Sequence, residues 1–220
     1  MNDLMRDKKY LLFDLDGTLT DPKEGITKSV QHALRYYGIE EPDLERLTPY
    51  IGPPLQAGFM EQHGLSERDA EEAVWKYREY FETQGIWENR RYEGILPLLR
   101  KLKEKGYVLA MATSKPEKFA KMIAERFEMA PYFTVIAGSL YDGGRTKKAE
   151  VIRHARKLLA CPPLDECLMI GDRKHDIEGA REVGIDALGV LYGFGDRQEL
   201  EKAEAGAIVA TVEELTAFLC

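Results

Sequence analysis

The sequence is poor in cysteine, has no excess of basic charge and contains no long apolar run. Its three cysteines, at positions 161, 167 and 220, are odd in number and lack the spacing of a metal site, which favours a reduced, cytoplasmic protein. The 31 basic side chains are outnumbered by 38 acidic ones, so the formal charge is −7 and a basic footprint for a nucleic acid polymer is lacking. Composition therefore excludes fibrous proteins and proteins that coat nucleic acids.

Apolar residues are nowhere contiguous over the length that a membrane requires. A spanning helix takes about 20 of them. The first apolar run, residues 10–13, is shorter even than the roughly 7–15 residues of a secretory signal. We therefore expect neither a membrane protein nor a secreted one. With 44% hydrophobic and 31% charged residues, the 220-residue chain fits one large globular domain, or one domain with a modest insertion.

Strand-like and helix-like segments alternate along most of the chain. Short apolar runs bounded by charge or glycine predict buried strands, and apolar residues three or four apart predict helices. Repeated units of this kind predict an α/β fold with a Rossmann-like parallel sheet and helices on both faces. The expected strands are residues 10–15, 107–112, 133–137, 167–170 and 187–191, and the expected helices are residues 95–105, 116–128, 147–159 and 177–183, with a last helix after Thr211.

One long stretch, residues 21–92, has no strand pattern. Helix starts are predicted at Asp21, where Pro22 suits the first turn, and at Ser66. A crossover between neighbouring parallel strands needs far less chain. We therefore divide the chain into a catalytic core, residues 1–20 and 93–220, and an inserted α-helical cap domain, residues 21–92. Ligands bind at the strand end where this cap is inserted, so it is expected to act as a lid.

The most informative motif follows the first expected strand. Asp14 and Asp16 are two residues apart, so in extended backbone their carboxylates point to the same side, and Gly17 permits a sharp turn. Two carboxylates in one place repel each other unless a cation compensates, and Mg²⁺ prefers such oxygen ligands. A calcium loop fits poorly because its fifth and twelfth positions would be Thr18 and Gly25. Solvated acids at a strand end are the simpler alternative.

Two polar groups follow later strands. Thr113 and Ser114 precede a helix start, where hydroxyl and N–H groups suit a phosphate oxygen, although an ordinary helix cap has the same pattern. Lys147 and Lys148 begin another helix, where positive charge opposes the helix dipole, and this indicates an anionic partner or else a solvated basic turn.

A second acidic pair follows the fourth expected strand. Asp172 comes directly after the strand and is the better metal candidate, whereas Asp176 taken alone is most simply the N-cap of the next helix. Each of these pieces is a weak signal by itself. Their common position at the carboxyl ends of parallel strands predicts that they lie together.

The order of these motifs resembles that of the haloacid dehalogenase-like phosphohydrolase superfamily over residues 10–219. The resemblance rests on the Asp-x-Asp-Gly-Thr signature that begins at Asp14, the hydroxyl of Thr113, the helix lysine and the Gly-Asp-x-x-x-Asp signature that ends at Asp176. The insertion is similar to the helical cap of the phosphoglycolate phosphatase-like branch. Residues 21–26, 51–55 and 88–95 resemble a subgroup labelled phosphoglycolate phosphatase or 5′-nucleotidase.

The resemblance implies a Mg²⁺-dependent phosphatase that hydrolyses a small-molecule phosphate monoester through an aspartyl-phosphate. Asp14 would be the nucleophile, and Asp16 the general acid and then the base. The Asp14 carboxylate, the Asp16 backbone carbonyl and Asp172 would hold the metal. Asp176 would bind a metal-bound water or orient the lysine.

The resemblance also implies a phosphate-binding set. Its members are Thr113, the Ser114 N–H and Lys148, and Gly52 of the cap and Lys115 are candidates for contact with the substrate. Lys148 matches the family's register better than Lys147, which stays as the fallback. Lys115 is equally well explained as a solvated basic residue ahead of a proline.

Other activities of the same fold remain as alternatives. A phosphomutase acting on a sugar phosphate shares every core residue. A dehalogenase would not need Asp16, Asp172 or the metal, and a receiver domain would lack the long insertion. The particular phosphate monoester stays open, as does the choice between a monomer and a homodimer.

Overall fold

The computed structural model describes residues 3–220 as two compact units. One unit combines the segment that ends at Thr20 with Arg91–Cys220, and the other is Asp21–Arg90. The sequence pattern predicted that the chain returns from the cap to the core after residue 92, and in the structure it returns after Arg90. Within residues 3–220, no helix combines the length and the apolar character that crossing a bilayer requires.

The larger unit contains a six-stranded sheet in the order β5-β4-β1-β6-β7-β8, and every neighbouring pair is parallel. Leu11, Leu12 and Phe13 of β1 are all fully buried, as expected for a parallel sheet covered on both faces. The predicted Rossmann-like α/β fold is therefore confirmed. The strands are β1 Tyr10–Phe13, β4 Val108–Pro116, β5 Val135–Ser139, β6 Cys167–Gly171, β7 Asp186–Val190 and β8 Ala207–Val209.

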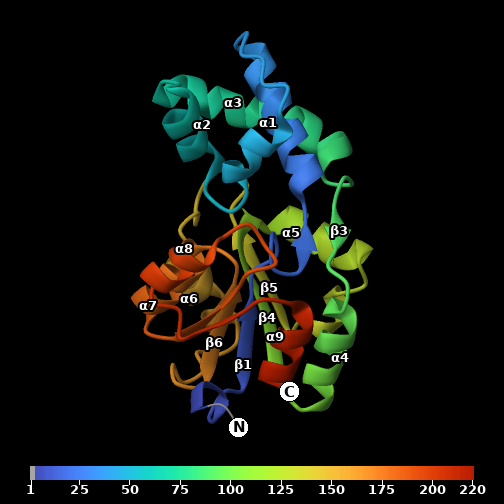
Figure 1. Ribbon diagram of the computed structural model, residues 1–220, viewed down its shortest axis with the longest axis vertical. Helices are drawn as coiled ribbons and strands as arrows, with labels where there is room; N and C mark the ends of the chain where they lie inside the picture. Colours follow the sequence, from blue (N-terminus) through green and yellow to red (C-terminus); the bar gives the residue numbers. More distant parts are fainter. Residues whose placement is uncertain (1–2) are drawn as a thin grey trace. The chain divides into compact units, whose positions relative to one another are not determined.

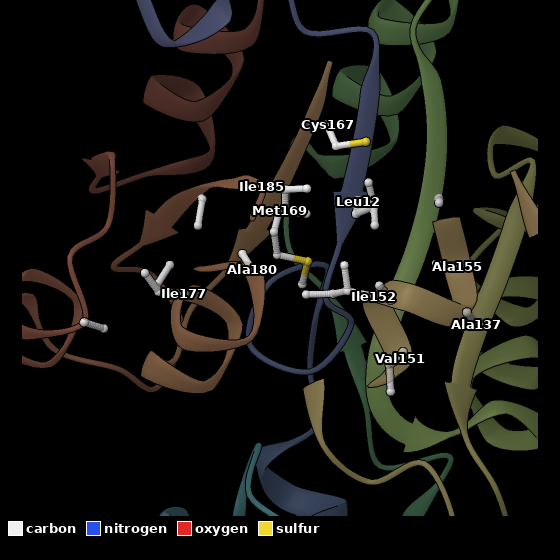
Figure 2. Close-up of a cluster of buried hydrophobic side chains, with 14 of the residues drawn as sticks. Leu12, Ala137, Val151, Ile152, Ala155, Cys167, Met169, Ile177, Ala180 and Ile185 are labelled. Carbon is white, nitrogen blue, oxygen red and sulfur yellow. The ribbon is translucent and has the colours of Figure 1, made fainter. Parts of the chain in front are cut away.

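Helices α6 and α7 cover one face of this sheet, and Figure 1 shows α4 and α9 on the other side of the strands. Figure 2 shows Val151 and Ile152 of α6 and Ile177 of α7 gathered with Leu12 and Met169 from the strands. Burial of each large side chain of this kind stabilises the fold by about 1.5–3 kcal/mol. The helices are α4 Ile95–Glu104, α5 Glu117–Arg126, α6 Lys148–Leu158, α7 Lys174–Val183, α8 Arg197–Lys202 and α9 Val212–Leu219.

Two features of the larger unit differ from the sequence pattern. Helix α7 begins at Lys174, so Asp176 lies in its first turn and is not its N-cap. The Asp176 Oδ2 atom instead accepts the Arg173 N–H at 3.1 Å. Helix α8 and strand β8 were not expected, because elements this short show too few repeats for a period to be read.

The smaller unit is helical, as predicted. Its elements are α1 Lys23–Tyr36, a 3-10 segment η2 Leu44–Tyr50, α2 Leu55–His63, α3 Glu67–Tyr80 and a π-helical turn η3 Phe81–Gly85. The Ser66 hydroxyl accepts the Asp69 N–H at 3.2 Å and caps α3 as expected. Helix α1 packs closely against η3, since a Cβ at Gly25 would lie 1.9 Å from the Gly85 carbonyl oxygen.

Two short strands mark the points where the chain passes between the units. They are β2 Thr20–Asp21 and β3 Arg90–Arg91, which pair with each other. Within the smaller unit, Arg90 Nε and Nη2 both donate to Asp21 Oδ2, at 2.9 and 2.7 Å. This ion pair joins the first and last residues of that unit.

Candidate active site

The first pair of acids lies in the turn that follows β1. The Asp14 N–H donates to the Ile170 carbonyl at 2.9 Å, which extends the pairing of β1 with β6 by one residue. Asp14 and Asp16 are only 4% and 8% exposed. Gly17 then turns the chain with φ +83°, and a Cβ there would lie 2.1 Å from Asp172 Oδ2. Glycine is therefore required for the close approach of this turn to Asp172.

The carboxyl ends of β1 and β6 bring three acids together. Asp172 follows β6 and is fully buried, and Asp176 is 1% exposed. One carboxylate oxygen from each of Asp14, Asp172 and Asp176 lies within 4.8 Å of the other two. The structure thus gathers these three residues, while the Asp16 carboxylate lies outside the group.

Lys148, the first residue of α6, is the cation of this cluster. Its Nζ lies 2.9 Å from Asp14 Oδ1 and 2.7 Å from Asp176 Oδ1, and it donates to the Ala112 carbonyl at 3.1 Å. Burial lowers the pKa of Lys148, but the charges of Asp14 and Asp176 outweigh burial and raise it above its ordinary value. Lys147 is exposed, so Lys148 is the lysine that the fold brings to the acids.

Lys115, near the end of β4, pairs with the other acid of the first motif. Its Nζ lies 2.5 Å from Asp16 Oδ2, and its residue is 8% exposed. The Asp16 Oδ1 atom is buried without a hydrogen-bond partner in the described part of the chain. Burial raises the pKa of Asp16, and the charge of Lys115 opposes that rise. Lys115 is therefore buried, not a solvated residue ahead of Pro116.

The predicted hydroxyl group lies on the same strand. Thr113 is 1% exposed, and its Oγ1 accepts the Lys115 N–H at 3.2 Å. Ser114 beside it is half-buried. The pairing of β4 with β5 shifts between Ala112 and Pro116, so the backbone is irregular where these polar groups occur.

Gly52, the predicted cap contact, belongs to the smaller unit. Its φ of +103° lies in a region that L side chains rarely adopt, which explains the glycine locally. Its contact with a substrate stays a prediction.

The buried acids fit a hard divalent cation. Four carboxylates face two ammonium groups in this site, those of Lys148 and Lys115. Burial and the charges of Asp176 and Asp14 raise the pKa of Asp172 well above its ordinary value, and burial raises that of Asp176. A divalent ion would offset the excess negative charge, and oxygen-only donors suit Mg²⁺.

A family profile described as "Haloacid dehalogenase-like hydrolase" matches residues 11–190, a range that contains all of these acids and lysines. The chain belongs to the haloacid dehalogenase-like hydrolase family. The resemblance noted in the sequence motifs is thereby confirmed.

Individual members of the family resemble this hydrolase along most of its length. A 5′-nucleotidase of Pseudomonas aeruginosa is 53% identical over 192 residues, which are 86% of each chain. The tyrosine-protein kinase PtkA of Mycobacterium tuberculosis is 41% identical over 210 residues, 94% of this chain and 71% of the kinase. The crystal structure of a predicted phosphatase from Clostridium acetobutylicum has a TM-score of 0.94 and 46% identity, covering 96% of this chain and 98% of that one.

This haloacid dehalogenase-like hydrolase is a phosphoric monoester hydrolase, as predicted. One segment that touches its acids was missed, the residues Tyr192–Gly195 that follow β7. The Phe194 N–H donates to Asp172 Oδ2 at 2.8 Å. The available signal was the alternation of glycine with aromatic residues at the end of an expected strand, where backbone must approach another group closely.

Proposed function

We propose that this hydrolase depends on Mg²⁺ and hydrolyses a small-molecule phosphate monoester through an aspartyl-phosphate on Asp14. Phosphoglycolate and nucleoside 5′-monophosphates are the substrate classes to consider first, the second being supported by the 5′-nucleotidase relative. The observation that carries the proposal is the buried group of Asp14, Asp172 and Asp176 with Lys148 between two of its carboxylates.

The first half of the reaction transfers the phosphoryl group to the enzyme. A carboxylate oxygen of Asp14 attacks phosphorus, and the bond from phosphorus to the leaving alcohol oxygen breaks. Asp16 donates its proton to that oxygen, so that an alcohol leaves and not an alkoxide. The raised pKa of Asp16, caused by burial, supports this acid role.

The second half returns the enzyme to its starting state. Asp16, now ionised, takes a proton from water, and the water oxygen attacks the phosphorus of the aspartyl-phosphate. The bond between phosphorus and the Asp14 oxygen breaks, and inorganic phosphate leaves with Asp16 again protonated.

The remaining residues of the site bind the phosphoryl group or orient the groups that do so. Lys148 and the groups at Thr113 and Ser114 hold phosphoryl oxygens and offset their charge in the transition state. Asp176, 2.7 Å from the Lys148 ammonium, orients it. The Asp14 carboxylate, the Asp16 carbonyl and Asp172 would hold Mg²⁺, which supplies positive charge to the phosphoryl oxygens when bound.

We also propose two substrate contacts, Gly52 of the cap and Lys115. The active form of the enzyme is a monomer or a homodimer. A cytoplasmic location is supported by Cys161, Cys167 and Cys220, which are free thiols.

Replacement of the nucleophile tests the mechanism. Asp14→Asn should abolish hydrolysis of p-nitrophenyl phosphate, while Asp165→Asn, an exposed acid at the other end of the sheet, should leave turnover unchanged. An acid-quenched reaction of the native enzyme should carry a phosphoryl group on the peptide that contains Asp14, as detected by mass spectrometry. Near-native turnover of Asp14→Asn would contradict the proposed nucleophile.

Product analysis tests the reaction class. A screen of phosphoglycolate, nucleoside monophosphates and hexose phosphates, ranked by kcat/KM, should release inorganic phosphate and require added Mg²⁺ after EDTA treatment. Conversion of a hexose phosphate to its isomer without phosphate release would instead indicate a phosphomutase. Phosphoryl transfer from ATP to a tyrosine hydroxyl would indicate the reaction for which the PtkA relative is named.

A further inference from the structure

The segment Tyr192–Gly195 encloses Asp172 from the side of β7. The Phe194 N–H donates to Asp172 Oδ2 at 2.8 Å, and the Thr18 hydroxyl donates to Asp172 Oδ1 at 3.3 Å. Both carboxylate oxygens are therefore held by donors that are not themselves acids or lysines of the site. These bonds restrict the rotation of a carboxylate that is already fully buried.

Two glycines bring this segment into contact with the site. A Cβ at Gly193 would lie 2.4 Å from both the Asp172 Cβ and the Gly17 carbonyl oxygen. A Cβ at Gly195 would lie 2.0 Å from the Asp172 carbonyl oxygen. Real Cβ atoms do not approach so closely, so the segment packs on the backbone of Asp172 and on the turn after Asp16 only because it lacks side chains there.

Tyr192 joins this segment to the same turn. Its hydroxyl donates to the Thr18 carbonyl at 3.0 Å, and its ring meets that of Tyr92 edge to face, with the ring centroids 5.1 Å apart. Burial raises the pKa of Tyr192, so the hydroxyl keeps the proton that it donates. Thr18 therefore receives a bond from Tyr192 at its carbonyl and gives one to Asp172 from its side chain.

We propose that Tyr192 is a positioning residue that acts through Thr18 to orient the Asp172 carboxylate for a divalent cation. The inference rests on the proposed Mg²⁺ site and names a residue outside the acid cluster that sets its affinity. Groups that orient a ligand from outside change metal affinity by about 10–100-fold when they are removed. Tyr192 contacts Thr18 and not Asp172 itself, so its removal is expected to change Mg²⁺ affinity by about 10-fold, the lower end of that range.

Direct measurement of metal binding tests this role without an activity assay. Protein freed of metal with EDTA and dialysed is titrated with MgCl₂ by isothermal titration calorimetry. Tyr192→Phe, which removes only the hydroxyl, should weaken Mg²⁺ binding about 10-fold. Tyr107→Phe changes a half-buried tyrosine at the opposite, amino end of β4 and should bind Mg²⁺ like the native protein. Equal affinity of Tyr192→Phe and the native protein would overturn the inference.

Variants of the intermediate residue give a second test that does not depend on the stability of Tyr192→Phe. Thr18→Val removes the bond to Asp172 and should also weaken Mg²⁺ binding, whereas Thr18→Ser keeps the hydroxyl and should restore it. In Thr18→Val the further change Tyr192→Phe should have little additional effect, because both changes break one chain of hydrogen bonds. Native affinity in Thr18→Val would overturn the inference. A native protein that binds no Mg²⁺ would contradict the proposed metal site itself, which separates the two failures.

Discussion

Lys115 Nζ lies 2.5 Å from Asp16 Oδ2, although the two residues are 99 positions apart in the chain. Both side chains are largely buried, with 5% and 10% of their surface exposed. Taking an ion pair out of water costs several kcal/mol per ion, and the attraction between the charges repays this cost only where their geometry is excellent. The pair is therefore best explained by position, because it holds the Asp16 carboxylate beside the proposed nucleophile.

Removal of this ammonium should impair catalysis. We expect Lys115→Met to lower kcat/KM for p-nitrophenyl phosphate by about 10²-fold or more, since general acid–base catalysis contributes about 10²–10⁴-fold and Asp16 would lose the group that orients it. The unfolding free energy should fall by about 1–3 kcal/mol, as measured in urea, because the buried Asp16 loses the group that is bonded to its Oδ2 atom. The control is Lys121→Met, which breaks only a surface pair with Glu117 and should change neither quantity appreciably. Native kcat/KM in Lys115→Met would contradict this assignment.

Replacement of the two adjacent lysines at the start of α6 should have very different effects on activity and stability. Lys148→Met leaves two buried carboxylates unpaired, so it should abolish phosphatase activity and lower the unfolding free energy by about 3–5 kcal/mol. Lys147→Met changes an exposed side chain and should stay within about 0.5 kcal/mol of the native protein. Urea unfolding and initial rates on the same preparations make the comparison. Loss of activity in Lys147→Met alone would reverse the choice of lysine.

The melting temperature should report both the binding of Mg²⁺ and the repulsion among the buried acids. The raised pKa of Asp172 means that its ionised form destabilises the fold, and this cost grows as the pH rises above the unfolded pKa of about 3.9 until it is complete above the folded pKa. In EDTA at neutral pH, Asp172→Asn should therefore melt at a higher temperature than the native protein. At a Mg²⁺ concentration of about 100 times Kd the native protein should gain about 2.7 kcal/mol, and Asp172→Asn should gain little.

Differential scanning fluorimetry in EDTA and in MgCl₂ measures both effects. Asp165→Asn, at an exposed position, should follow the native protein in each buffer. If Mg²⁺ stabilised Asp172→Asn as much as the native protein, Asp172 would not be a metal ligand.

The helical unit should lose stability in mild acid through His63. The Tyr50 hydroxyl lies 2.7 Å from His63 Nδ1, and burial lowers the pKa of this imidazole below its ordinary value. A base with a lowered pKa stabilises the fold fully above its unfolded pKa of about 6.5, and that contribution is lost as the pH falls through the folded pKa. NMR titration should place the His63 pKa below 6.5, and Tyr50→Phe should raise it because the neutral ring loses a hydrogen-bond donor.

A histidine variant provides the stability comparison. The loss of unfolding free energy between pH 7 and pH 5 should be smaller in His63→Gln than in the native protein. An unshifted His63 pKa would contradict the role given to burial.

Local features of the sequence were sufficient for much of this description. The apolar run at residues 10–15 predicted β1, which ends two residues earlier at Phe13, and the serine at Ser66 predicted the start of α3. Apolar runs and helix caps are both local, because they depend on neighbours in the chain. The spacing of Asp14 and Asp16 likewise predicted two acids at a strand end. Short elements such as β8 and α8 were not predicted, because three or six residues are too few to show a periodic pattern.

The sequence by itself thus determined the fold class, the family and the main acids, all of which are written in local patterns and their order. Only the tertiary structure decided which cations and donors meet those acids. Lys148 and not Lys147 reaches Asp14, Lys115 is buried against Asp16, and Tyr192 bonds to Thr18 across 174 positions. These contacts depend on strand register and on the close packing of turns. Both bring together segments that are far apart in the chain, so the spacing of residues within one segment does not predict them.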